Sequence, residues 1–207
     1  MAVHRSTVQA DGVTETALAA SPGPWTVEDL TGLVEDGRRY EIVDGSLLVT
    51  PAPSLGHQGV AQRLATLLDG CCPPGWEAVQ APGLQLRREP TTRLLIPDVA
   101  VVRSDVLWGG AGTVAADEVL LAVEVVSPSS EMTDRITKPA LYAAAGIAAY
   151  WRVELDDRLL GITIVLHRLA EGNYVEDRLV HAGQTATIDW PLRCRLDPAS
   201  LVGPRNR

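Results

Sequence analysis

The strongest structural signal in the sequence is the apolar run Val119-Leu120-Leu121-Ala122-Val123-Glu124-Val125-Val126. It is the most apolar strand candidate in the chain, and a strand of this kind lies centrally in a sheet, buried on both faces. Its single polar residue is Glu124, and a buried carboxylate is costly unless it is paired with a cation or bound to a metal. An ion pair with an arginine would be a structural explanation. Because perturbed acids cluster at functional sites, we favour a functional role.

The segments before this strand predict a hairpin, a helix and three more strands. The hairpin covers residues 39–50 and turns at Asp44-Gly45, a pair typical of a type I′ turn. Residues 57–68 carry apolar side chains at helical spacing and predict an amphipathic helix. The strands are predicted at residues 76–80, 84–88 and 98–103.

The segments after residue 126 continue the alternation of strands and helices. A helix is predicted to end near Gly146, and the next strand covers residues 149–155. Strands and turns are expected over residues 161–196.

The length of 207 residues suits one domain and makes two ordinary domains a poor fit. Residues 1–24 lack sustained periodicity and are mostly small or polar, so we expect a flexible N-terminal tail there. Order should begin at Trp25, where Thr26 and Asp29 predict a capping box that opens a short helix ending near Gly37. The predicted single domain therefore spans residues 25–207.

The composition limits the classes of function. The formal net charge of −8 argues against a protein that coats nucleic acid by bulk electrostatics, but it leaves room for a local basic groove or a metal site. Three cysteines without a CxxC pair argue against a disulfide scaffold or a structural zinc site. No apolar run is long enough to cross a bilayer and the N-terminus lacks the order of a signal peptide, so we expect a cytoplasmic protein.

A second acid, Asp98, follows Pro97 and opens the apolar strand Val99-Ala100-Val101-Val102. On its own it could be a turn residue, since Asp commonly follows Pro at the start of a strand. Together with Glu124 it gives two hydrophobic strands with one acid each, and their carboxylates could meet at one point. Hard cations such as Mg²⁺ choose such oxygen ligands and keep several waters.

Lys138 follows Glu124 by a loop and the start of a helix, from where it could reach back over the end of the strand. The alternative is a solvated lysine paired with Asp134 four residues earlier, and the residue pattern alone favours this alternative. Pro139 fits only the first turn of a helix, which places Lys138 at a helix N-terminus.

Several motifs taken together resemble one family. They are Tyr40-Glu41-Ile42-Val43-Asp44-Gly45, Ile96-Pro97-Asp98-Val99-Ala100-Val101-Val102, Val123-Glu124-Val125-Val126-Ser127-Pro128-Ser129-Ser130, Leu141-Tyr142-Ala143 and Tyr150-Trp151, with His57, Asp134 and Lys138. As a set they resemble the Uma-type restriction endonucleases of the PD-(D/E)XK superfamily, roughly from Trp25 to the end of the chain. The resemblance implies an α/β (α+β) fold of the restriction-endonuclease type, with a mixed central β-sheet flanked by helices.

The resemblance also implies an endonuclease that hydrolyses phosphodiester bonds of nucleic acid, above all DNA, with Mg²⁺ or Mn²⁺. Asp98, Glu124 and the carbonyl of Val125 would hold the metal, and Asp98, Glu124 and Lys138 would be the catalytic residues. The superfamily usually carries its lysine two residues after the glutamate, where this chain has Val126. The lysine on the following helix would replace it.

Three further residues are candidates with open alternatives. Glu41 would correspond to a superfamily glutamate that supports the metal site, although it could also be an exposed strand acid. A lone histidine at the start of a helix, such as His57, more often caps the helix or lies at the surface than acts as a base. The resemblance implies that His57 is an auxiliary residue of the site. Arg135 competes with Lys138 for the role of the cation, since it could contact phosphate bidentately.

The main rival function is a non-catalytic nucleic-acid-binding or assembly module that keeps the nuclease fold without turnover. The pair of acids favours the enzyme, whereas the displaced lysine and the negative net charge favour the rival. A third reading is a structural interaction domain, in which an internal arginine would neutralise Glu124. Nucleases of this fold often act as symmetric pairs, which makes a homodimer a candidate.

Overall fold

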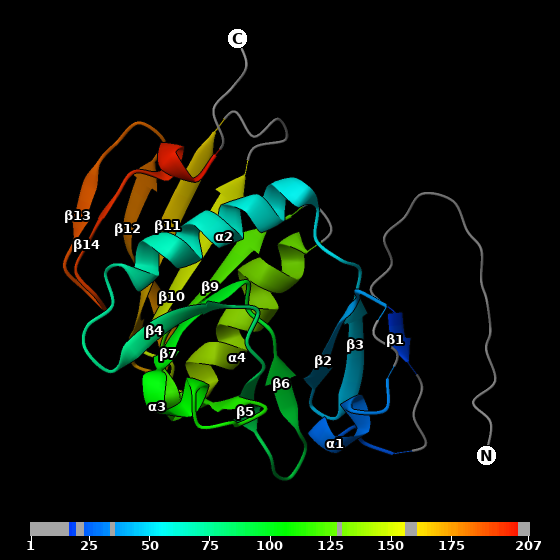
Figure 1. Ribbon diagram of the computed structural model, residues 1–207. Coiled ribbons are helices and arrows are strands. Elements are labelled where there is room, and N and C mark those ends of the chain that lie inside the picture. Colours follow the sequence, from blue (N-terminus) through cyan, green and yellow to red (C-terminus); the bar gives the residue numbers. More distant parts are fainter. Residues whose placement is uncertain (1–16, 20–22, 34–35, 128–129, 156–160, 203–207) are drawn as a thin grey trace, which may run out of the picture.

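The computed structural model describes residues 17–19, 23–33, 36–127, 130–155 and 161–202 (Figure 1). In these ranges the chain forms two six-stranded sheets and one two-stranded sheet. The helices are α1 (Val27–Leu30), α2 (Leu55–Asp69), α3 (Ser104–Leu107) and α4 (Lys138–Ala144), with the 3-10 turns η1 (Ala116–Glu118) and η3 (Pro198–Leu201) and the π-helical turn η2 (Thr133–Thr137). The strands are β1 (Ala17–Ala19), β2 (Arg39–Val43), β3 (Ser46–Thr50), β4 (Trp76–Gln80), β5 (Leu84–Arg87), β6 (Arg93–Leu95), β7 (Val99–Arg103), β8 (Val114–Ala115), β9 (Val119–Val126), β10 (Ala149–Leu155), β11 (Ile162–Ala170), β12 (Asn173–His181), β13 (Ala186–Ile188) and β14 (Cys194–Leu196).

Of the two six-stranded sheets, the one with the longer strands is called the larger sheet here, and its strand order is β12-β11-β10-β9-β7-β4. Strand β9 lies inside this sheet, parallel to β10 and antiparallel to β7, so the sheet is mixed. Its bounds are those predicted from the sequence, and all of its residues except Leu120 are buried. The predicted central strand is therefore confirmed, and so is the mixed α/β fold.

The two faces of the larger sheet are covered by different helices. Val123 and Val125 of β9 pack in the same core cluster as Val60 and Leu64 of α2, and Figure 1 shows α2 lying across this face. Ala122, one position out of phase, packs in a second cluster with Tyr142 of α4. Because side chains alternate along a strand, Glu124 shares the α4 face with Ala122.

The smaller sheet has the order β1-β3-β2-β6-β5-β8, and its β2–β3 hairpin matches the prediction. Asp44 and Gly45 both have positive φ values, 50° and 79°, as a type I′ turn requires. Gly45 is also crowded, because a Cβ there would lie 2.7 Å from the Cβ of Pro24. Strand β6 was not predicted, since it has three residues and a single registered pair with β2.

The N-terminal region adds one strand to the prediction and shortens one helix. Ala17–Ala19 forms strand β1 and pairs with β3, whereas residues 1–16 and 20–22 lie outside the described residues, so the flexible tail stays a prediction. The capping box is present, with Asp29 Oδ2 accepting a bond from the backbone N–H of Thr26 at 2.8 Å. Helix α1 nevertheless ends at Leu30 rather than near Gly37, with a tightened last turn in which the backbone N–H of Thr31 donates to the Glu28 carbonyl at 3.2 Å. Residues 34 and 35 of the predicted segment lie outside the described residues.

The helical run around Lys138 begins earlier than expected. Lys138 is the first residue of α4, but the turn before it is already π-helical and the backbone N–H of Lys138 donates to the carbonyl of Thr133, so the predicted helix N-terminus at Lys138 is wrong. Pro139 has no N–H to donate, and the carbonyl of Asp134 accepts instead from the Tyr150 hydroxyl at 2.6 Å.

Among the described helices, none is long and apolar enough to span a membrane.

Candidate functional site

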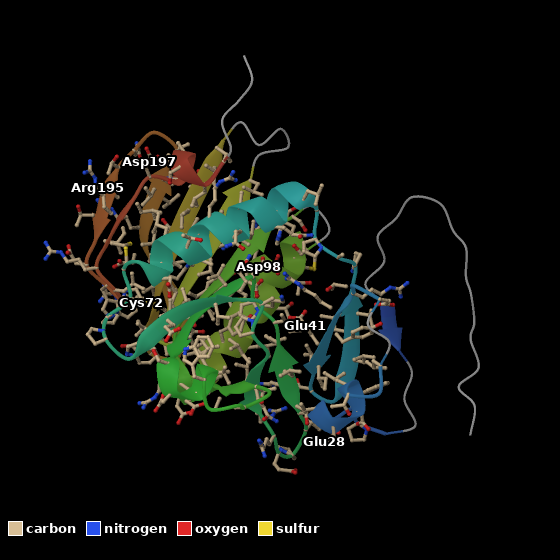
Figure 2. The ribbon with its side chains drawn as sticks, viewed as in Figure 1. Glu28, Glu41, Cys72, Asp98, Arg195 and Asp197 are labelled. Carbon is tan, nitrogen blue, oxygen red and sulfur yellow. The ribbon has the colours of Figure 1, made fainter. Side chains whose placement is uncertain are left out.

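The described part of the chain encloses a cavity of about 460 Å³ at the point where β9 ends and β7 begins. Figure 2 shows Asp98 and Glu41 near the middle of the molecule, whereas Glu28 and Asp197 lie at its periphery. One wall of the cavity is the loop between β3 and α2, and another is the segment between β9 and α4. Its lining residues are Arg39, Glu41, Thr50, Pro51, Ala52, Pro53, Ser54, His57, Asp98, Glu124, Ser127, Ser130, Thr133, Asp134 and Lys138.

Asp98 and Glu124 reach this cavity because of the register between β7 and β9. Val99 pairs with Val123 in the antiparallel ladder, so Asp98 and Glu124 stand one step further along and on the same face. The two residues are only 2% and 1% exposed. Asp98 is fixed from below, since its Oδ2 accepts the backbone N–H of Val125 at 2.8 Å. The structure thus brings the two sequence-predicted acids to one cavity.

Lys138 is buried in the same cavity, at 6% exposure. Its Nζ lies 3.1 Å from Glu124 Oε1, 3.1 Å from Glu41 Oε1 and 3.8 Å from Asp134 Oδ1. The alternative of a solvated lysine is therefore wrong, although its pairing with Asp134 is present. The ion-pair partner of Glu124 is therefore Lys138, and not an arginine as the structural alternative expected.

Glu41 and His57 are also interior residues, so neither lies at the surface. Glu41 is 1% exposed, and its Oε1 accepts the backbone N–H of Ile96 at 2.7 Å. The Nε2 atom of His57 lies 2.8 Å from the carbonyl oxygen of Val125 and 3.1 Å from Asp98 Oδ2. His57 therefore contacts both the carbonyl and one of the carboxylates that the sequence resemblance implied as metal ligands.

Two further side chains contact the acids and were not identified from the sequence. Nη1 of Arg39 lies 2.5 Å from Asp98 Oδ1, and the hydroxyl of Tyr142 donates to Glu124 Oε1 at 2.7 Å. Spacing could have pointed to both. Arg39 is two residues from Glu41 on one strand, and Tyr142 is four residues from Lys138 on one helix, so each pair shares a face.

Arg135 does not join the site. Its guanidinium pairs with Glu131 and with Glu154, the latter at 2.7 Å, and its side chain is 42% exposed. It is absent from the residues that line the cavity. Of the two cations that the sequence offered, the structure brings only Lys138 to the acids.

The cavity carries more negative than positive groups. Four carboxylates, those of Glu41, Asp98, Glu124 and Asp134, face one lysine and one arginine. Burial raises the pKa of Glu124 well above its usual value, and the other carboxylates add to this effect while Lys138 opposes it. Burial likewise raises the pKa of Asp134.

The pKa values of Lys138 and Asp98 are each shifted by neighbouring charges of the opposite sign. Burial alone would lower the pKa of Lys138, but the surrounding carboxylates, Glu124 first, outweigh it and raise the pKa, so the ammonium stays charged. Burial alone would raise the pKa of Asp98, but the side chains of His57, Arg39 and Lys138 outweigh it and lower the pKa to about 2. Asp98 is thus held in its ionised form, whereas burial raises the pKa of Glu124 and Lys138 is the group that opposes its protonation.

The donor set suits a hard divalent cation but forms no closed cage. Among the residues that the structure describes, no three His, Cys, Asp or Glu side chains gather closely enough to hold a metal ion by themselves. Mg²⁺ characteristically takes one or two carboxylates and completes its shell with water and substrate phosphate. Two carboxylates and a backbone carbonyl fit that habit, and the surplus negative charge of the cavity favours a bound cation.

Comparisons with known proteins bear on the fold and on the family of the chain. One solved structure that matches is a protein from Anabaena variabilis, described as a "putative nuclease belonging to DUF820", with a TM-score of 0.62, 16% identity, and coverage of 86% of this chain and 97% of that one. This likeness supports the fold. No curated protein matches the sequence significantly. The model of the Uma2 family, described as "Putative restriction endonuclease", matches residues 26–197, and the chain therefore belongs to the Uma2 family.

Proposed function

We propose that the protein is a metal-dependent endonuclease that hydrolyses phosphodiester bonds of nucleic acid, with DNA as its principal substrate. The observation that carries the proposal is the cavity in which four buried carboxylates outnumber the lysine and the arginine beside them. Keeping such a surplus away from water is costly, and natural chains retain it where it binds a cation or performs chemistry. Membership of the Uma2 family supports the same class of enzyme.

Asp98, Glu124 and the carbonyl of Val125 would hold Mg²⁺ or Mn²⁺ in this proposal. When bound, the ion would polarise the phosphate and lower the pKa of a water molecule that attacks the phosphorus in line. His57, Arg39 and Lys138 lower the pKa of Asp98 more than burial raises it. This low pKa keeps the ligand ionised at every physiological pH.

The protein's own side chains would hold these ligands in place. Tyr142 and Lys138 both contact Oε1 of Glu124, which fixes that carboxylate from the side of α4. His57 contacts Asp98 and the carbonyl of Val125 from the side of α2. Ligands fixed from two sides lose little entropy when an ion or a phosphate binds.

One observation favours the rival, a non-catalytic nucleic-acid-binding or assembly module. The ammonium of Lys138 lies at equal distance from Glu41 and Glu124, 3.1 Å from each, so a resident cation already compensates these acids without a metal. A module of this kind would keep the charged cavity as part of its core. The predicted homodimer and cytoplasmic location stay predictions for either function.

The deciding experiment incubates the purified protein with plasmid DNA and with single-stranded DNA and RNA, in Mg²⁺, in Mn²⁺ and in EDTA. We expect cleavage with either metal, none in EDTA, and at least a hundredfold loss in Asp98→Asn and in Glu124→Gln. Asp105→Asn is the matched control, because Asp105 lies beyond the far end of β7 and its side chain is 63% exposed. Wild-type rates in both cavity variants would show that these acids do not carry the cleavage, and no cleavage by a folded wild type would favour the binding module.

A further inference from the structure

We propose that Arg39, rather than Lys138, is the side chain that binds the phosphate of the substrate. This inference rests on the proposed function and names the residue through which the same cavity recognises nucleic acid. It reverses the expectation from the sequence, in which a lysine or arginine after β9 supplies the positive charge to the phosphate.

Lys138 is already engaged by the acids of the cavity. An ammonium group has three N–H donors, and its Nζ lies 3.1 Å from both Glu41 Oε1 and Glu124 Oε1 and 3.8 Å from Asp134 Oδ1, the last a charge contact longer than a hydrogen bond. Its side chain is only 7% exposed. Lys138 therefore serves as the internal cation that compensates the acids.

Arg39 has donors left. A guanidinium carries five N–H donors, and the described hydrogen bonds of Arg39 use one of its nitrogens, Nη1, for Asp98 Oδ1. Its side chain is 21% exposed, whereas the charged side chains of Lys138, Asp98 and Glu124 are 7%, 2% and 1% exposed. An anion that enters the cavity from solvent therefore meets the guanidinium of Arg39 before any other cation of the lining.

The position of Arg39 on β2 and its contact with Asp98 suit phosphate binding. It opens β2, a strand paired on both sides, and the contact of 2.5 Å with Asp98 fixes one edge of the guanidinium plane. Two parallel N–H groups on one of the remaining edges match two phosphate oxygens, and a lysine cannot offer this geometry. A guanidinium already ordered by a buried carboxylate loses little rotamer entropy when the phosphate arrives.

A purely structural role, in which Arg39 only neutralises Asp98, makes a different prediction. Asp98 keeps two other partners, the backbone N–H of Val125 at 2.8 Å and His57 Nε2 at 3.1 Å. Loss of a structural arginine would change stability and leave the dependence of nucleic-acid binding on salt unchanged. Loss of a phosphate contact lowers the slope of log K against log salt by about 1.

The test measures fluorescence anisotropy of labelled single-stranded and double-stranded oligonucleotides from about 50 to 200 mM NaCl. Ca²⁺ replaces Mg²⁺ in these titrations, so that turnover does not consume the probe. The variants are Arg39→Gln and Arg39→Lys, and unfolding curves of each confirm that it is folded. The control is Arg103→Gln, because Arg103 also pairs with an aspartate, Asp105, at 2.5 Å, but stands at the other end of β7 and outside the cavity lining.

We expect Arg39→Gln to weaken binding about tenfold and to reduce the salt slope by about 1, with Arg39→Lys in between and Arg103→Gln like the wild type. If the wild type cleaves nucleic acid while Arg39→Gln keeps its affinity, the phosphate role is overturned and the nuclease stands. Weaker binding with an unchanged slope overturns it as well, since Arg39 then acts only through Asp98. A folded wild type that neither binds nor cleaves any probe overturns both proposals.

Discussion

Two clusters of charged side chains in this protein use the same kinds of residue in opposite ways. The cavity cluster consists of Arg39, Glu41, Asp98, Glu124, Asp134 and Lys138, and its acids outnumber its cations. The hairpin cluster consists of Asp44, Arg87 and Arg93, and its cations outnumber its one acid. The acids of the cavity cluster are nearly inaccessible, whereas the side chain of Asp44 is 48% exposed.

The difference between the clusters lies in what water can do for them. Solvent screens the hairpin cluster and hydrates any charge that lacks a partner, so such pairs contribute about 0–1 kcal/mol. Water cannot reach the cavity cluster in the same way, so each buried charge there depends on its neighbours. The surplus of acid in the cavity is therefore costly for folding, and we attribute its presence to function.

The comparison is sharpened most by removing the one cation at the centre of the cavity cluster. Lys138→Met leaves Glu41, Glu124 and Asp134 buried without their shared partner. We expect the free energy of unfolding to fall by about 3–5 kcal/mol, the cost of breaking a buried pair from one side. Urea unfolding followed by circular dichroism measures it.

The control for Lys138→Met is the double variant Lys138→Met with Glu124→Gln. It removes the carboxylate that becomes unpaired, so the double variant should be more stable than the sum of the two single losses predicts, by about 1–3 kcal/mol. Strictly additive losses would mean that the lysine and the glutamate do not depend on each other, and the contrast with the hairpin cluster would lose its basis.

A change in pH tests Asp98, the member of the cavity cluster that is held ionised. Its pKa in the folded protein is about 2, because His57, Arg39 and Lys138 outweigh the effect of burial, whereas the ordinary pKa of an aspartate is 3.8. A lowered folded pKa stabilises the protein above the unfolded pKa, and this contribution disappears as the pH falls towards 2.

We therefore measure the free energy of unfolding of wild type and Asp98→Asn by urea in EDTA, and expect the difference between them to be constant above about pH 5. Below about pH 4 this difference in unfolding free energy should become smaller, by about 2 kcal/mol in total. Asp105→Asn, which alters an exposed pair, should show little narrowing. A difference that stays constant down to pH 2 would place the stabilising contacts of Asp98 in doubt.

A smaller effect is expected from a neutral donor that contacts one of the cavity acids. Tyr142→Phe removes the hydroxyl that donates to Glu124 at 2.7 Å, and bonds to a charged acceptor contribute about 1.5 kcal/mol or more. Tyr174→Phe is the matched control, because its hydroxyl donates at the same 2.7 Å to a neutral acceptor, the Ile147 carbonyl. Thermal or urea unfolding should show the larger loss for Tyr142→Phe, and equal losses would indicate that Glu124 is not ionised in the fold.

The sequence predicted the scaffold of the cavity well because local patterns determine it. Apolar runs placed β7, β9 and β10, the Asp44-Gly45 pair placed the hairpin, and helical spacing placed α2. Each of these signals depends on neighbours within a few residues. The elements that were missed are short: β6 has three residues, β8 has two, α3 has four, and β1 lies in a stretch without periodicity.

The partners within the cavity were harder to predict, because they come from segments far apart in the chain. Arg39 meets Asp98 across 59 residues, and His57 meets Val125 across 68. Nothing local to Glu41 distinguishes a buried strand acid from an exposed one. The π-helical turn before Pro139 was also invisible, since it depends on the Tyr150 hydroxyl that takes up the Asp134 carbonyl.

The smallest effect should come from the hairpin cluster, where Asp44→Asn removes its only carboxylate. Asn tolerates the positive φ of 50° at this position and favours the type I′ turn before Gly45, so the substitution removes charge without straining the backbone. Arg87 keeps its bonds to Thr91 at 2.7 and 2.9 Å. We expect the free energy of unfolding to change by less than about 1 kcal/mol, and the difference from wild type to shrink further in about 0.5 M NaCl, because salt screens exposed pairs. A loss above about 2 kcal/mol that persists in high salt would show that the hairpin cluster behaves like the buried one, and exposure would no longer explain the contrast between them.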